Sequence, residues 1–278
     1  MSLWQVSPSC GAPGLRAQLP WAGTAGVGAA PGAGPPAWCC AWDGEGARLA
    51  AGFADGTLAL WHPAHHPGAA LAPAAQLGAF PGGVAAGLCF LSPSVVVAAG
   101  SGAEGHLVLW DVLCPPRTAR VASFAAHAGA AGAACVARCG SACWSVLTAG
   151  AAAGDVARFD LRAAAASGAA VPLWRAPAGG APAACLAVAA WGGPGPADGV
   201  VLAGDRAGDL RLLDARTGGL LQHVPAAHPR QLFAPPQRLG GSSIVAGVTA
   251  VLPLPGGALP CGADGAIKLH RRANTADE

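Results

Sequence analysis

The chain has no tyrosine, and it has one methionine, one lysine and one asparagine (Met1, Lys268 and Asn274). Charged residues make up only 11% of its 278 residues, and the formal net charge is +2. A protein that binds nucleic acid or an anionic membrane through its charge needs a denser basic surface than this. The shortage of basic residues, and of lysine above all, therefore argues against nucleic acid as a partner.

Long hydrophobic runs are also missing. No run of 18 or more apolar residues is free of glycine, proline and charge, so we expect no integral membrane segment. The first ten residues lack the basic region followed by an apolar stretch that marks a secretory signal. The ten cysteines do not suggest a secreted disulfide scaffold, because the chain is too long for that class. Most of them lie in apolar segments, where a free thiol packs as a small hydrophobe. We therefore expect a cytoplasmic protein.

A short phrase recurs five times in the chain. A glycine is followed by apolar residues at alternate positions, and the phrases begin about 50 residues apart, at Gly56, Gly105, Gly154, Gly208 and Gly265. A period of two is typical of a half-buried strand. Strand phrases that return at this spacing predict an all-β propeller, in which each repeat is one blade.

Two further strands precede each phrase. The predicted first strands are 38–42, 86–91, 134–137, 185–189 and 248–252. The second strands are 48–53, 94–99, 145–148, 200–203 and 257–261, and the third strands cover the phrases themselves, the last at 266–270. Asp55-Gly56 between two such runs is typical of a tight hairpin. Glycine and proline recur too often for a helix of useful length, despite the many alanines.

A propeller blade needs a fourth strand, which we expect in the connectors, at 119–124 and 219–224. Residues 15–19 could supply the fourth strand of the last blade and close the ring. The alternative is an incomplete ring with blades missing. We therefore expect an N-terminal strand and a Gly/Pro/Ala-rich loop in 1–37, a propeller in 38–272 and a tail in 273–278.

The repeats resemble WD40 repeats. Trp110-Asp111 is the dipeptide that names the family, and Phe159-Asp160 and Leu213-Asp214 are degraded forms of it. Loop acids, and histidines just before the next repeat, resemble the hydrogen-bond set that clamps a WD40 hairpin to its blade. The residues expected to hold these structural positions are Asp55, Trp61, Trp110, Asp111, His127, Phe159, Asp160, Asp214, His228 and Asp264. No repeat carries the full set, because the first lacks a clear histidine and the third has no acid before Gly154.

From about residue 38 the chain resembles more closely the C-terminal WD40 region of the DmX-like, or rabconnectin-3, family. The resemblance lies in residues 91–100, 107–115 and 159–162, and in a closing order of residues: His228, Gln231, Phe233, Gly247-Val248, Cys261 to Gly265, and Lys268. It implies a non-catalytic scaffold in the assembly and regulation of the vacuolar proton-transporting ATPase. It also implies protein partners among the pump and assembly-complex subunits, on endosomal or vacuolar membranes. The family's long upstream regions are absent from this sequence.

A second interpretation comes from Asp160-Leu-Arg162 and Asp214-Ala-Arg216. These match the Asp-x-Arg ending of WD40 substrate receptors in cullin-RING ubiquitin ligases. In that case Arg162 and Arg216 would contact the ligase adaptor. Otherwise they form rim salt links or are simply exposed arginines.

Other motifs give weaker evidence for a function. Residues 100–105 spell the dinucleotide-binding pattern G-x-G-x-x-G, but a strand is predicted next where that fingerprint requires a helix. Cys135, Cys139 and Cys143 match no familiar zinc or iron–sulfur spacing. The serine motif G-x-S-x-G is absent, and most acids sit in hairpin turns. We therefore expect no enzymatic activity, no metal and no cofactor.

Overall fold

The computed structural model is almost entirely antiparallel β-sheet. It describes residues 2–5, 14–18, 35–62, 73–102, 106–127, 132–139, 144–152, 154–167, 171–177, 185–191, 199–228, 247–254, 257–262 and 266–271. The chain divides into two compact units, Met1–Ser123 and Phe124–Glu278. Among the described residues the single helix is α1 (Leu161–Ser167). No helix in this part of the chain is long and apolar enough to cross a membrane.

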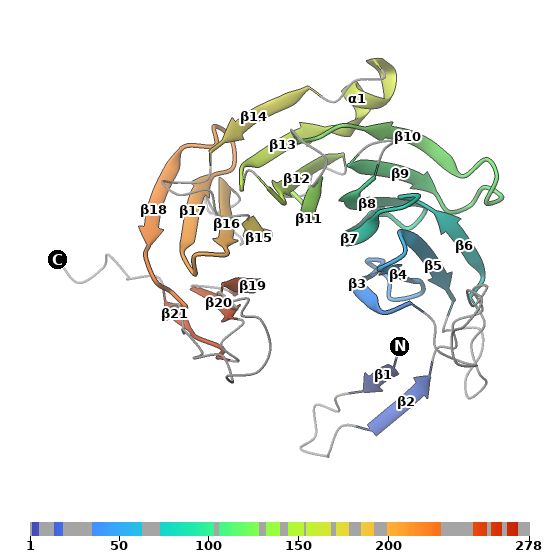
Figure 1. The fold of residues 1–278 in the computed structure, drawn as a ribbon, viewed down its shortest axis with the longest axis horizontal. Coiled ribbons are helices and arrows are strands. Elements are labelled where there is room, and N and C mark those ends of the chain that lie inside the picture. The colour runs from blue at the N-terminus through green and yellow to red at the C-terminus, as the bar shows by residue number, and fades with distance from the viewer. Residues whose placement is uncertain are drawn as a thin grey trace, which may run out of the picture. The chain divides into compact units, whose positions relative to one another are not determined.

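The first unit contains a strand pair and two larger sheets (Figure 1). β1 (Ser2–Gln5) pairs with β2 (Gly14–Gln18). One four-stranded sheet runs in chain order through β3 (Ala37–Trp42), β4 (Leu49–Phe53), β5 (Thr57–Trp61) and β6 (Ala75–Gly78). The next runs through β7 (Val84–Ser92), β8 (Val95–Ser101), β9 (Leu107–Asp111) and β10 (Arg120–Phe124). Each is an up-and-down meander.

The second unit continues the same pattern. One sheet consists of β11 (Ala133–Arg138), β12 (Ser145–Gly150), β13 (Val156–Asp160) and β14 (Pro172–Ala176). A second consists of β15 (Cys185–Trp191), β16 (Val200–Asp205), β17 (Leu210–Asp214) and β18 (Leu220–Val224). The last has three strands, β19 (Val248–Leu254), β20 (Gly257–Gly262) and the short β21 (His270–Arg271).

One irregularity recurs in all five of these meanders. The register between the first and second strands shifts near the start of the first strand, at Ala37/Cys39, Ala85/Gly87, Ala133/Cys135, Cys185/Ala187 and Val248/Ala250. Such a bulge bends a strand and increases its local twist. Because the same bulge lies at the equivalent place in each sheet, the repetition in the sequence is a repetition of one structural unit.

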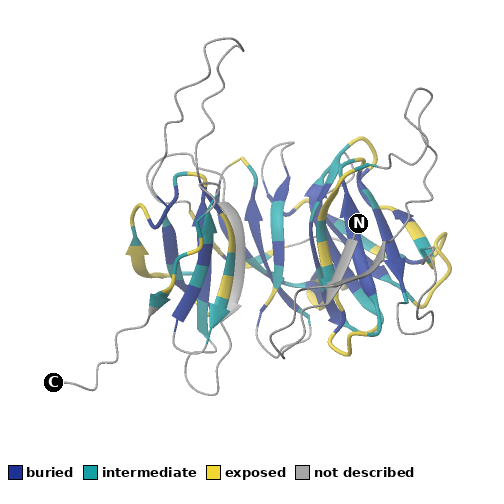
Figure 2. Ribbon diagram, turned by 90° about the horizontal axis from the view of Figure 1, so that it is seen from below, coloured by how far each residue is buried: buried dark blue, intermediate teal, exposed yellow. Residues whose placement is uncertain are grey.

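Within each unit, neighbouring sheets meet through their first strands. In the first unit β7 lies against β3 and β4. In the second unit β15 lies against β11 and β12, and β19 against β15 and β16. Every residue of β4 and of β12 is buried, and Figure 2 shows burial concentrated in the strands and exposure mainly in the turns. The core is therefore made of inner strands pressed face to face, which suits small side chains such as alanine.

Gly52 in β4 shows how tightly these faces meet. A Cβ at this position would lie 2.7 Å from Cys39 Sγ in the same sheet and 2.8 Å from Ala85 Cβ in the next sheet. Such overpacking typically costs about 1–3 kcal/mol. We therefore expect Gly52→Ala to lower the free energy of unfolding by about 1–3 kcal/mol, which a lower urea midpoint would show. Gly78→Ala in β6 is the control, since a Cβ there meets no atom within 4 Å. Equal midpoints for the two variants would show that the sheet spacing is not set at Gly52.

Most predicted strands are confirmed, usually to within a few residues at each end. The connector strands expected at 119–124 and 219–224 are β10 and β18. The strand expected at 266–270 is wrong in extent, because only the isolated bridge Cys261–Ile267 and the two residues of β21 pair with β20. The strand expected at 15–19 exists as β2, but it pairs with β1, and the last sheet keeps three strands. Helix α1 was not expected.

Candidate functional site

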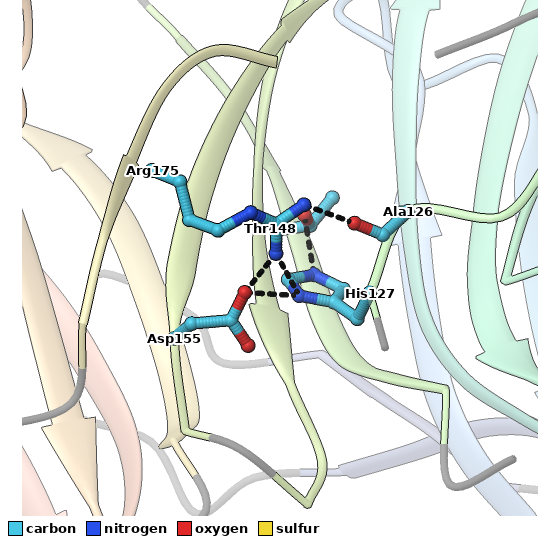
Figure 3. Close-up of polar contacts among 5 residues, drawn as sticks. All are labelled: Ala126, His127, Thr148, Asp155 and Arg175. Carbon is cyan, nitrogen blue, oxygen red and sulfur yellow. Dashed lines mark hydrogen bonds and ion pairs between the residues drawn. The ribbon is translucent and has the colours of Figure 1, made fainter. Parts of the chain in front are cut away.

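The most elaborate polar cluster lies in the second unit (Figure 3). His127, in the connector after β10, is hydrogen-bonded on both sides of its ring. Its Nδ1 lies 2.9 Å from Asp155 Oδ2, and its Nε2 lies 2.8 Å from Thr148 Oγ1. Arg175 on β14 contacts Asp155 through Nη1 and donates from Nη2 to the Ala126 carbonyl over 2.7 Å. The cluster thus joins the connector, the β12–β13 hairpin and the outermost strand of one sheet.

The surroundings of His127 decide its tautomer. Asp155 can only accept a hydrogen bond when ionised, so a proton on Nδ1 satisfies both groups. Nε2 is then the acceptor, and the hydroxyl of Thr148 donates to it. Arg175 Nη1 also lies 3.2 Å from His127 Nδ1, but its acceptor in this arrangement is the carboxylate of Asp155. Every member of the cluster therefore has a role that fits its neighbours.

Electrostatics reinforce this arrangement. Burial by itself would raise the pKa of Asp155, but the hydrogen bonds and charges of His127 and Arg175 outweigh it and hold the pKa below its ordinary value. Asp155 is consequently ionised at neutral pH. Gly150 on β12 makes room for the pair, because a Cβ there would run into the Asp155 carboxylate and lie 3.0 Å from His127 Nδ1.

The order Thr148–His127–Asp155 has the connectivity of a nucleophilic triad. A triad needs a hydroxyl that a substrate can reach. Thr148 is 0% exposed and His127 is 6% exposed, so no substrate can approach the hydroxyl in this conformation. The arrangement instead acts as a clamp that fixes the hairpin to the connector and to β14.

Sequence reasoning found only one member of this clamp. His127 was predicted, but Asp155, Thr148 and Arg175 were not. Asp155 was missed because it follows the turn glycine, whereas the other loop acids considered, such as Asp55, precede theirs. The signal that could have revealed Asp155 is the Gly-Asp pair, which recurs at Gly208-Asp209.

Asp209 repeats part of the clamp in the next sheet. Its Oδ2 lies 3.0 Å from His223 Nε2, and its Oδ1 accepts from Ala226 N over 2.8 Å. His223 pairs with Arg211 across β17 and β18, as Arg175 pairs with Ala157 across β13 and β14. In both sheets, therefore, a basic side chain on the outermost strand contacts the acid that follows the turn glycine.

The second predicted histidine, His228, is fully buried, and its Nε2 lies 3.1 Å from the Pro260 carbonyl. Its backbone N donates to the carbonyl of Gly208 over 2.9 Å. In the first unit Phe80 N makes the same bond to Gly56 O over 3.0 Å. Phe80 therefore holds, after the first meander, the position that His228 holds after the fourth.

The acids of the Trp-Asp-like dipeptides cap turns. The Oδ1 atoms of Asp111, Asp160 and Asp214 accept backbone N–H groups two residues later, over 3.0, 3.0 and 2.8 Å. Asp55 caps Thr57 in the same way over 3.0 Å. Such bonds stabilise the turn that follows a strand.

The aromatic residues predicted beside these turns, namely Trp61, Trp110 and Phe159, are all buried. Their burial agrees with a structural role. Asp264 lies outside the described residues, so its predicted position stays a prediction.

The two Asp-x-Arg turns leave their arginines at the surface. The Arg162 side chain is 68% exposed, and its Nη2 lies 3.4 Å from Oδ2 of its own Asp160. Arg216 is also exposed. The turn carrying Arg216 is firmly held, because the Ala215 carbonyl accepts from Arg158 Nη1 over 2.7 Å and from Trp174 Nε1 over 2.8 Å.

The remaining motifs lie apart from this clamp. After Gly100 in β8 the chain continues into strand β9, not into a helix, and residues 103–105 lie outside the described part. Cys135 lies on β11 and Cys139 directly after it, while Cys143 is not described. In the described ranges no three His, Cys, Asp or Glu side chains gather as metal ligands. Burial raises the pKa of the Cys39 thiol to about 12, which leaves that thiol unreactive.

No protein-family model matches this chain, and no curated protein matches its sequence.

Proposed function

We propose that the chain forms five blades of a WD40-type β-propeller, in a ring that is either complete or part of a larger one. Three features support this fold. The meanders repeat with an identical bulge, their first strands stack on one another within each unit, and the outermost strands are peripheral. The bond between His127 and the acid Asp155 is similar to the pairing of a histidine with a loop acid expected of WD40 hairpins.

The function we propose is a non-catalytic scaffold that binds other proteins. The observation that carries it is the burial of Thr148, His127 and Asp155. These side chains have the connectivity of a catalytic triad, but they hold the hairpin in place and are closed to a substrate. Recognition then falls to the turns and loops that a rigid sheet framework presents. By its resemblance to the DmX-like family, the chain takes part in assembling the vacuolar proton-transporting ATPase. It would act in the cytoplasm, at the surface of endosomes or vacuoles.

A pull-down from native extract tests this role, together with lumenal pH in cells that lack the protein. We expect recovery of subunits of the pump's soluble sector and a more alkaline vacuole. The clamp variant Asp155→Asn should recover fewer pump subunits than the wild type, because its loops lose their framework. Normal acidification with no pump subunit recovered would refute the proposal.

The exposure of Arg162 and Arg216 favours one second candidate, a substrate receptor of a cullin-RING ubiquitin ligase. It predicts co-purification with a cullin adaptor that Arg162→Ala or Arg216→Ala abolishes. Arg117→Ala is the control, because Arg117 is exposed in the corresponding turn of another sheet but lies outside any Asp-x-Arg sequence. Adaptor binding that survives both arginine variants would exclude this role.

A further inference from the structure

The last strand position of the last sheet is held by few contacts. Among the described residues, pairing of 266–271 with β20 consists of the Cys261–Ile267 bridge with its two backbone bonds, Gly262 N to Ala266 O over 3.0 Å and Lys268 N to Pro260 O over 3.1 Å, and of the two residues of β21. Ile267 is 70% exposed and Leu269 is 50% exposed. A segment with so little packing on its outer side opens at low free energy.

Lys268 and His270, which alternate with Ile267 and Leu269 in this segment, lie near the connector that follows β18. Lys268 Nζ donates to the Ala227 carbonyl over 2.5 Å. His228, the next residue of that connector, is fully buried and lies 3.1 Å from the Pro260 carbonyl. His270 Nε2 is a buried atom that has no hydrogen-bond partner among the described residues. A buried ring nitrogen of this kind is tolerated while it is unprotonated and becomes costly when it carries a charge.

The described groups that act on the charge of His270 are basic side chains. Burial first, then His228 and Lys268, lower the pKa of His270 below its ordinary value. On the adjacent strand the titratable side chain is Cys261. Asp264, in the turn before the segment, is not among the described residues. Protonation of His270 thus places a positive charge beside the basic side chains of His228 and Lys268, in a partly buried place.

We propose that residues 266–271 form an acid-released latch, which closes on β20 while His270 is neutral and opens when His270 becomes charged beside Lys268 and His228. Opening frees the outer edge of β20. An unpaired strand edge is a template for pairing with another strand. The fifth sheet would then offer an edge in acid that it covers at neutral pH.

The direction of the pH effect follows from linkage. In the open segment His270 regains an ordinary pKa of about 6.5, so the open form binds the proton more readily than the closed form. Closure is therefore fully stabilised above that pH and weakens as the pH falls through it. The same sign would not arise for a histidine that gains a carboxylate partner on folding.

The unique lysine provides a site-specific test, because endoproteinase Lys-C can cut this chain only after Lys268. At about pH 8, where histidine is neutral, His270→Arg supplies a permanent charge, and His270→Gln replaces the ring with a neutral amide. We expect His270→Arg to be cut about tenfold faster than wild type, and the excess to shrink in high salt because screening weakens like-charge repulsion. His270→Gln should be cut at close to the wild-type rate.

The matched control is His223→Arg, which adds a charge at a half-exposed histidine on β18 that faces Asp209. This variant should leave cleavage at Lys268 unchanged. Equal cleavage of wild type and His270→Arg would overturn the latch. So would equally fast cleavage of His270→Gln and His270→Arg, because packing and not charge would then hold the segment.

Hydrogen exchange provides the second measurement and does not depend on whether His270→Arg folds. Amides of 257–262 and 266–271 in the wild type should lose protection between about pH 7.5 and pH 5.5, after correction for the intrinsic rate. The His270→Gln protein should keep that protection, and β12 should be unaffected in both. Loss of protection in His270→Gln at the lower pH would refute the role of His270.

Discussion

A Gly208→Ala variant is expected to lose about 2–4 kcal/mol of unfolding free energy. Gly208 lies in the turn just before β17 with φ = +89°, a backbone conformation that an L-residue adopts only with strain. The added Cβ would also overlap the backbone carbonyl of His228. That carbonyl cannot easily move away, because His228 is fully buried and its N is bonded to Gly208 O over 2.9 Å. Urea unfolding followed by circular dichroism measures the loss.

Gly199→Ala is the matched control for this variant in the same unit, since a Cβ there meets no atom within 4 Å. It should change stability by less than about 0.5 kcal/mol. Gly56, with φ = +78° and the carbonyl of Phe80 against it, should behave like Gly208. A Gly208→Ala protein as stable as the Gly199→Ala protein would show that the hairpin is not anchored to the connector.

The glycines that begin the recurring phrase are also the reason why so much of the fold could be predicted from the sequence. Gly56, Gly154 and Gly208 all have positive φ, so the recurring phrase marked true chain reversals. The strands on either side alternate or are continuously apolar because both of their faces are packed within the sheet stack. Local signals therefore located the inner three strands of four meanders and the first two strands of the fifth.

The outermost strands had weaker signals. β6 and β14 were not predicted, because an edge strand with one open side needs no regular alternation of apolar residues. Pro172 at the start of β14 is tolerated there, since proline at the first residue of a strand breaks no ladder bond. β21 failed in the opposite sense: residues 266–270 alternate well, yet only a bridge and two residues pair with β20. Pairing depends on what lies beside a segment, and the sequence of the segment does not contain that information.

The clamp was harder to predict, because its members are far apart in the chain. His127 was recognised from its place before a repeat. Arg175 lies 48 positions further on, in a strand that was itself not predicted. Thr148 gave no signal, because threonine is an ordinary strand residue. The pairing of β12, β13 and β14 brings Thr148, Asp155 and Arg175 together, and His127 reaches them from the connector.

Asp155→Asn is expected to cost about 2–4 kcal/mol. The change keeps the size of the side chain but removes the charge that both His127 and Arg175 face. Removing one partner of a fully buried ion pair usually costs more stability than this. The cost is smaller here because the Arg175 side chain is 37% exposed and partly screened by solvent. Urea midpoints at neutral pH measure the effect. Asp214→Asn is the control, because Asp214 Oδ1 accepts from the backbone N–H groups of Arg216 and Thr217, which an asparagine oxygen also accepts.

The pH dependence separates loss of charge from loss of shape. Since the pKa of Asp155 is lowered on folding, its ionised form stabilises the protein above the unfolded-state value of about 4. This contribution disappears as the pH falls through the folded-state value. The stability difference between wild type and Asp155→Asn should therefore be largest near neutrality and shrink in acid below about pH 4. A difference that stays constant into acid would mean that Asp155 holds the hairpin by packing alone, and that the charge facing Arg175 adds nothing to the clamp.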